Sequence, residues 1–142
     1  MKQRIYRYVT LLGLITIGLT PLNIYAEEKA PEITFTKLTH NFGLFDRENG
    51  LQRCDFIFTN TGNKDLVILS AVASCGCTEP IFPKTLIPVG ASDTIKVTYD
   101  GTTRRPGVFK KVITVKTNAK VNTTYLYITG EMVEALPNSS EK

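Results

Sequence analysis

The sequence QRCDFIFT at residues 52–59 decides the fold class of this chain. In an extended strand, neighbouring side chains point to opposite faces, so Cys54, Phe56 and Phe58 share one face while Arg53 and Asp55 lie on the other. This alternation, with aromatic residues on the inner face, is typical of a strand that is half buried in an antiparallel sheet. The stretch therefore predicts a β-strand whose apolar face forms part of the core.

The same period of two recurs before and after this stretch. Residues 33–37, 93–100, 111–117 and 124–132 alternate β-branched or aromatic side chains with polar ones. Residues 66–73 are more continuously apolar, which predicts a strand covered on both faces. Together the strands predict a core that includes Phe56, Phe58, Ile95, Val97, Ile113, Val115 and Ile128.

Turn residues separate these strands. Asparagine and glycine occupy the polar loop at 60–65, and proline with glycine occurs at 88–90 and 105–107. No stretch after residue 26 shows a sustained helical period. We therefore expect an all-β protein, an immunoglobulin-like β-sandwich of about seven short strands, preceded by a signal peptide. The expected sandwich domain spans 32–134, between a short linker at 27–31 and a flexible tail at 135–142.

The N-terminus has the pattern of a secretory signal peptide. Lys2, Arg4 and Arg7 precede an apolar run at 9–22, and the small residue Ala26 is followed by acidic residues. The run is shorter than the roughly 20 residues that a membrane-spanning helix needs. We therefore expect cleavage near Ala26, with residues 1–26 removed and no transmembrane segment left in the exported protein.

Charge argues against nucleic-acid binding. The leader contains three of the 17 basic residues and none of the 13 acidic ones, so its removal leaves a net charge near +1. Nucleic-acid-binding proteins carry a basic patch or stripe, and this sequence has only isolated pairs of basic residues. We expect no nucleic-acid partner.

Ordered motifs across the chain resemble a known family. They are HNFG at 40–43, FTNTG at 58–62, SCGCT at 74–78, Pro88 with Gly90, and PG at 106–107. This set resembles the bacterial domain-of-unknown-function family numbered 1573, over roughly residues 35–132, and SCGCT is its most specific element. The resemblance implies an immunoglobulin-like domain similar to the major sperm protein and pilus-chaperone folds. It also implies an exported or surface protein, of a kind frequent in the Bacteroides and Flavobacterium group, but no activity.

Catalytic groups are sparse in this sequence. His40 is the only histidine, so any acid–base or nucleophilic scheme that needs histidine must use it. The carboxylates are scattered, and no phosphate-binding or calcium-binding loop motif is present. We expect no enzymatic activity and no cofactor, and a local hydrogen bond as the simplest role for His40.

Cysteines carry the sharpest chemical signal. Cys75 and Cys77 are separated by one glycine, and Cys54 is the third cysteine in a chain bound for an oxidising compartment. In an extended strand the Cα atoms of residues i and i+2 lie roughly 6.6 Å apart, at the upper end of the usual disulfide range of about 4.4–6.8 Å. A tighter turn at Gly76 would make a disulfide feasible. Three roles stay open: a structural pair, a labile redox pair, or a soft-metal site.

A zinc site would need more ligands than this pair. Cys54 and His40 would complete a Cys₃His set with Cys75 and Cys77, but only if the fold gathers all four side chains. The sequence alone leaves the metal unknown.

The function expected from the whole sequence is binding. Immunoglobulin-like domains present sheet edges and loops to partners, and Arg104 with Arg105 forms a loop tip that could contact an acidic group. We expect an exported, non-catalytic binding or assembly module of the periplasm or cell surface. Its partner would be another exported protein or a cell-envelope component. The alternative is a thiol-redox or soft-metal-handling protein that uses Cys75 and Cys77.

Overall fold

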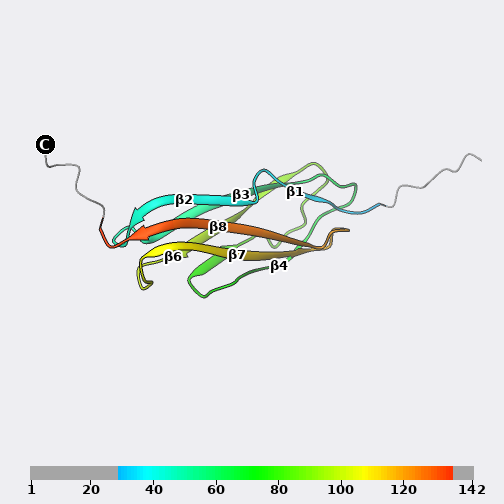
Figure 1. The fold of residues 1–142 in the computed structure, drawn as a ribbon. Helices are drawn as coiled ribbons and strands as arrows, with labels where there is room; N and C mark the ends of the chain where they lie inside the picture. Colours follow the sequence, from blue (N-terminus) through cyan, green and yellow to red (C-terminus); the bar gives the residue numbers. More distant parts are fainter. Residues whose placement is uncertain (1–28, 136–142) are drawn as a thin grey trace, which may run out of the picture.

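Two four-stranded sheets form the structure, which is a computed structural model that describes residues 29–135 (Figure 1). One sheet has the order β1-β3-β6-β5 and the other β2-β8-β7-β4. The predicted all-β sandwich is thus confirmed. The strands are β1 (Ile33–Phe35), β2 (Thr39–Asp46), β3 (Leu51–Asn60), β4 (Ile68–Ala73), β5 (Thr78–Ile81), β6 (Ser92–Asp100), β7 (Gly107–Thr117) and β8 (Thr123–Val133).

Several predictions fall outside the described residues. These are the signal peptide at 1–26, the first part of the linker at 27–31 and all but the first residue of the tail at 135–142. Within the described range, no helix is long and apolar enough to cross a membrane.

The core lies between the two sheets and contains every residue predicted for it. Phe56, Phe58, Ile95, Val97, Ile113, Val115 and Ile128 are all 0–1% exposed. They alternate with exposed side chains along β3, β6, β7 and β8 because each strand has one face on the core and one in solvent.

The prediction that residues 66–73 form a strand covered on both faces is wrong. β4 is the edge strand of its sheet, and Leu69 and Val72 are 63% and 62% exposed. The register with β7 shifts between Ile68 and Ser70, so Leu69 lies in a bulge. Only part of the apolar run, Leu66 and Ile68 among it, is fully buried.

Eight strands form because the N-terminal segment divides between the sheets. β1 pairs with β3 in one sheet, and residues 36–38 cross to the other, where β2 pairs in parallel with β8. The register of β2 shifts between Asn41 and Leu44, and Gly43 there has a φ of 72°, a conformation that favours glycine. The change of sheet leaves β1 only three residues long.

Candidate functional site

The SCGCT motif forms the connection between the edge strands β4 and β5. Cys75 and Cys77 are joined by a disulfide, and their Cα atoms lie 5.3 Å apart. The Thr78 amide donates to the Cys75 carbonyl at 3.2 Å, which closes a turn around Gly76. This turn shortens the Cα separation below that of an extended strand, so the disulfide bridges residues that are only two apart.

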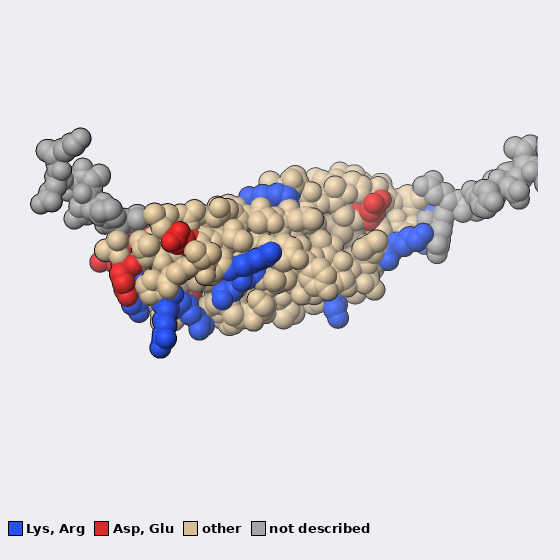
Figure 2. All heavy atoms as spheres, viewed as in Figure 1, with Lys and Arg blue, Asp and Glu red and all other residues tan. Residues whose placement is uncertain are grey.

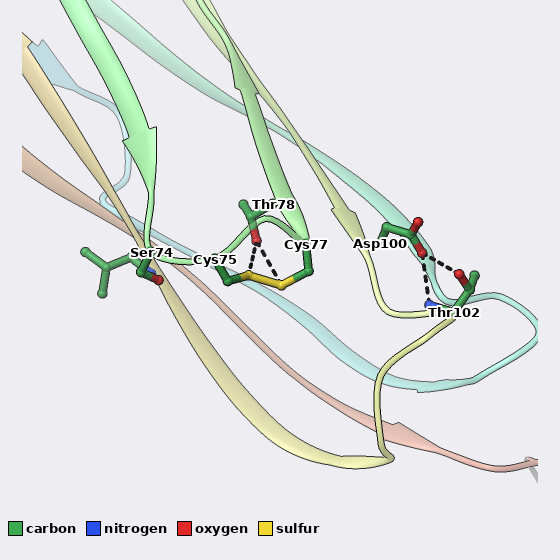
Figure 3. The surroundings of a disulfide bond; sticks show 7 residues. Ser74, Cys75, Cys77, Thr78, Asp100 and Thr102 are labelled. Atoms are coloured by element: carbon green, nitrogen blue, oxygen red, sulfur yellow. Dashed lines mark hydrogen bonds between the residues drawn. A yellow bond between two sulfur atoms is a disulfide. The ribbon is translucent and has the colours of Figure 1, made fainter.

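Backbone hydrogen bonds hold the disulfide turn, which Figure 3 shows, to both sheets. The Ser74 amide donates to the Val112 carbonyl of β7 at 2.8 Å, and the Asp100 amide of β6 donates to the Cys77 carbonyl at 2.8 Å. Cys77 and Thr78 are buried, and the Thr78 hydroxyl lies 3.5 Å and 3.9 Å from the two sulfur atoms. The connection between the sheets is therefore fixed at each end of the turn.

The loop after β6, which contains Arg104 and Arg105, begins beside this turn. Asp100 is the last residue of β6, and its carboxylate accepts hydrogen bonds from the amide and hydroxyl of Thr102 at 3.0 Å and 2.6 Å. The bond from the Thr102 hydroxyl, and to a smaller extent the bond from its amide, lower the pKa of Asp100. The Arg104 amide then donates to the Gly101 carbonyl at 2.8 Å. The structure thus places both arginines at the same end of the sandwich as the disulfide.

Neither arginine is paired with a carboxylate in the described part of the chain. The ion pair found there joins Arg47 to Glu134 at 3.1 Å. Both Arg104 and Arg105 are exposed. In Figure 2 the broad face of the sandwich is mostly uncharged, and charged side chains of both signs gather at the end where β2 and β8 finish. We call residues 74–78 and 100–105 together the disulfide end.

Cys54 lies in the core, away from the disulfide turn. It is a free thiol on β3, 7% exposed, and it pairs in register with Val97 of β6. Burial, partly offset by the nearby Lys37 ammonium, raises its pKa to about 11. The thiol is therefore protonated and unreactive at neutral pH.

His40 lies in the other sheet, in β2, next to Ile128 of β8. The Lys37 ammonium donates to its Nδ1 at 2.9 Å, and its ring packs edge-on against Phe42 at 4.7 Å. Burial and the charge of Lys37 lower the pKa of His40. The local hydrogen bond expected for this residue is present.

The four possible zinc ligands are not brought together. Across residues 29–135, no group of three or more histidine, cysteine, aspartate or glutamate side chains is placed to hold a metal ion. Cys75 and Cys77 are consumed by their disulfide, while Cys54 and His40 belong to different sheets. The Cys₃His arrangement therefore does not exist in this structure.

Sequence reasoning missed two parts of the disulfide end. The contact of the Thr78 hydroxyl with both sulfurs could have been expected from the sequence, because Thr78 directly follows Cys77. No sequence pattern indicates that Asp100 and Thr102 lie close to the motif, because this closeness arises from the pairing of Thr78 in β5 with Tyr99 in β6.

The fold is an immunoglobulin-like β-sandwich in which a disulfide between Cys75 and Cys77 closes the connection from one sheet to the other. Residues 33–132 match the family described as protein of unknown function (DUF1573). This chain belongs to that family, so the resemblance carried by its motifs is confirmed. No curated protein matches the sequence.

Solved structures share the fold at low sequence identity. A protein of unknown function from Porphyromonas gingivalis W83 is 15% identical, with a TM-score of 0.64 over 77% of this chain and 51% of that one. This chain therefore spans about half the length of that protein. The PapD-like domain 7 of human CEP192 is 12% identical, with a TM-score of 0.57 over 78% and 91%. The YadV chaperone is 15% identical, with a TM-score of 0.54 over 75% and 54%.

Proposed function

We propose that this protein is an exported, non-catalytic binding or assembly module of the periplasm or cell surface. The signal-peptide pattern supports export, and the disulfide suits an oxidising compartment. Its partner is another exported protein or a cell-envelope component. The chaperone and PapD-like domain that share its fold support a binding role by analogy of fold alone.

The observation that carries this proposal is the construction of the disulfide end. Binding residues act best from loops that a rigid scaffold holds in place. Here the turn at 74–78 is held by a covalent bond and by backbone hydrogen bonds to both sheets. One of these bonds comes from Asp100 of β6, and the loop with Arg104 and Arg105 starts at the end of that strand. Two guanidinium groups without a carboxylate partner among the described residues suit a carboxylate or phosphate on the partner.

Site-specific photo-crosslinking in cells that export the protein tests this proposal. A photoreactive residue at Thr103, in the arginine loop, is expected to form a discrete crosslink to an envelope component. The matched control is Val121, which is 74% exposed at the opposite end of β7. Equal or absent crosslinking at the two positions would contradict a binding role for the disulfide end.

A charge variant then tests the arginines themselves. Arg104→Ala with Arg105→Ala should reduce the crosslink from Thr103 severalfold. Lys120→Ala, a charge loss in the exposed loop beside Val121, should leave it unchanged. If the double variant crosslinks as well as the unaltered protein, the arginines do not take part in binding.

Counting free thiols tests the redox alternative. The purified, unfolded protein should take up one thiol label per chain before reduction and three after it, because only Cys54 is free. A mixed population with three labels before reduction would favour a redox-active pair over a structural one.

The same sample shows by its N-terminal sequence whether cleavage occurs near Glu27.

A further inference from the structure

One strand of the sandwich is left half uncovered. β1 pairs with β3 only at Phe58, Thr59 and Asn60, and the last backbone bond between these segments runs from the Thr36 amide to the Ile57 carbonyl at 3.0 Å. From Leu51 to Phe56, β3 is paired with β6 on one side, and no described strand lies on the other. We call residues 51–56 of β3 the open segment.

The register identifies which backbone groups of the open segment are unpaired. In an antiparallel ladder, alternate residues direct their amide and carbonyl groups to the same side. The Asn60 amide donates to the carbonyl of Ala91, just before β6. The Ile57 carbonyl and the Thr61 amide instead bond to Thr36 and Glu32, on the β1 side. Arg53 and Asp55 share the direction of Ile57, so their amide and carbonyl groups point to the uncovered side.

The vacant position beside the open segment faces the second sheet. Residues 36–38 carry the chain from β1 into the other sheet, and residues 47–50 carry it back from β2 to β3. β2 therefore runs in the second sheet opposite the open segment. A single added strand can lie above β2, but a folded second copy would bring its own second sheet into the space that β2 occupies.

The surroundings of this position are positively charged. An open hollow there is lined by Thr36, Lys37, Arg53, Asp55, Ile57 and Lys96, with Cys54 beside them. Three cations face one carboxylate. No ion pair within 4.0 Å joins these groups among residues 29–135, where Arg47 and Glu134 form the one pair found. Ile57 is 46% exposed, and the Lys37 ammonium lies 5.9 Å from the centre of the Phe56 ring.

We propose that the open segment of β3 binds an extended, acidic segment of a partner protein as an added β-strand. The guest backbone pairs with the amide and carbonyl groups of Arg53 and Asp55, as in other strand-addition complexes. Inward guest side chains are apolar, because they approach Phe56 and the stem of Lys37. An outward carboxylate lies near Arg53 and Lys96. This surface is separate from the disulfide end, so either proposal can fail without the other.

Amide exchange measured by NMR on the exported protein tests this inference with a defined probe. The probe is a capped synthetic peptide in which valine alternates with glutamate, and the matched control peptide has lysine in place of glutamate. At saturation, the amides of Arg53 and Asp55 should exchange about tenfold more slowly with the acidic peptide. They should be unaffected by the basic one. The amides of Ala71 and Ala73 on β4, the edge strand of the other sheet, serve as an internal control.

Two variants separate charge from backbone pairing. Arg53→Glu should abolish the protection by the acidic peptide, while Lys116→Glu, an exposed charge reversal on β7, should not. Asp55→Pro removes an amide that has no partner in the free protein, so it should be compatible with the fold but not with the guest strand. Should Asp55→Pro fail to fold, the Arg53→Glu comparison decides alone.

Three results would overturn the proposal. The first is no protection of Arg53 and Asp55 by the acidic peptide. The second is equal protection of Ala71 and Ala73, which would show unspecific strand pairing. The third is protection that rises with protein concentration in the absence of peptide, together with a dimer in sedimentation velocity, because a second copy would then be the occupant.

Discussion

The two sides of the sandwich carry the chain from one sheet to the other in different ways. On the β4–β5 side, the chain passes between sheets through a disulfide-closed turn, and the edge strands are interrupted by the bulge at Leu69 and by Pro80. On the β1–β2 side, the chain passes through residues 36–38 with no covalent link. Exposed edges invite unwanted strand pairing, and bulges, prolines and short strands suppress it.

The difference shows where an intermolecular contact is tolerated. The β4–β5 side is blocked against a regular added strand, and its exposed features are loops, which suit side-chain recognition. The β1–β2 side keeps a regular stretch of β3 with unpaired backbone groups beside a cationic hollow. Backbone recognition is therefore available on one side only, and the following predictions test that asymmetry.

The largest expected effect is in the amide exchange of the free protein. The amides of Cys54 and Phe56 bond to β6 in the core and should exchange at least on the order of a thousandfold more slowly than those of Arg53 and Asp55. Exchange measured residue by residue by NMR checks this. Equal protection along residues 53–56 would mean that β3 is covered on both sides, and the contrast between the two sides would disappear.

A core substitution comes next in size. Phe58 is fully buried at the point where β1 still covers β3, and its ring packs 5.6 Å from that of Phe35. Phe58→Ala should lower the free energy of unfolding by about 3–5 kcal/mol, since it leaves a cavity.

The control for this substitution is Ile57→Ala, one residue earlier on the solvent face. It should cost less than about 1 kcal/mol, as substitutions outside the core usually do. Urea denaturation of both variants measures the difference. A cost below about 1 kcal/mol for Phe58→Ala would show that the inner face of β3 has been assigned wrongly.

Removal of the disulfide should have a smaller effect. The bond closes a loop of three residues, for which chain entropy gives about 1.5 kcal/mol. Cys75→Ala with Cys77→Ala should therefore lower the free energy of unfolding by roughly that amount and leave the fold intact, because the Ser74 and Asp100 amides still hold the turn. Reduction with dithiothreitol should lower the stability of the unaltered protein similarly. A loss of the native fold in either experiment would mean that the covalent bond, and not the backbone, determines the crossing.

The sequence was sufficient to predict the sandwich because its core strands alternate cleanly. Phe56, Phe58, Ile95 and Val97 are buried as their period of two indicates. β2 was not predicted as a separate strand, since its bulge at Gly43 interrupts the alternation. The continuous apolar run at 66–73 was misleading because local hydrophobicity cannot distinguish a central strand from an edge strand with a bulge.

The candidate sites were less predictable than the core. A tighter turn at Gly76 made a disulfide between Cys75 and Cys77 feasible, but whether that turn forms and whether Cys54 and His40 approach the pair depended on the folded structure. The approach of the arginine loop to the disulfide depends on the register between β5 and β6. The open segment of β3 depends on where β1 stops pairing. Both are tertiary properties that no local period encodes.

The smallest expected effect is a pH dependence on the β1–β2 side. Burial and the Lys37 ammonium lower the pKa of His40 below its ordinary value of 6.5. The unfolded chain therefore binds a proton more readily than the folded protein, and stability contributed by the neutral ring is complete above pH 6.5 and is lost as the pH falls through the folded pKa. A modest fall in the urea midpoint between pH 7.5 and 5.5 should follow, and His40→Gln should remove it. The carboxylate of Asp100, whose pKa is also lowered, titrates below this window and does not confuse the comparison.

Lys37→Met should raise the pKa of His40 in an NMR titration, because the ammonium that donates to Nδ1 is gone. If the pKa stays unchanged in that variant, Lys37 does not lie against His40 in solution, and the account of how residues 36–38 cross between the sheets must change.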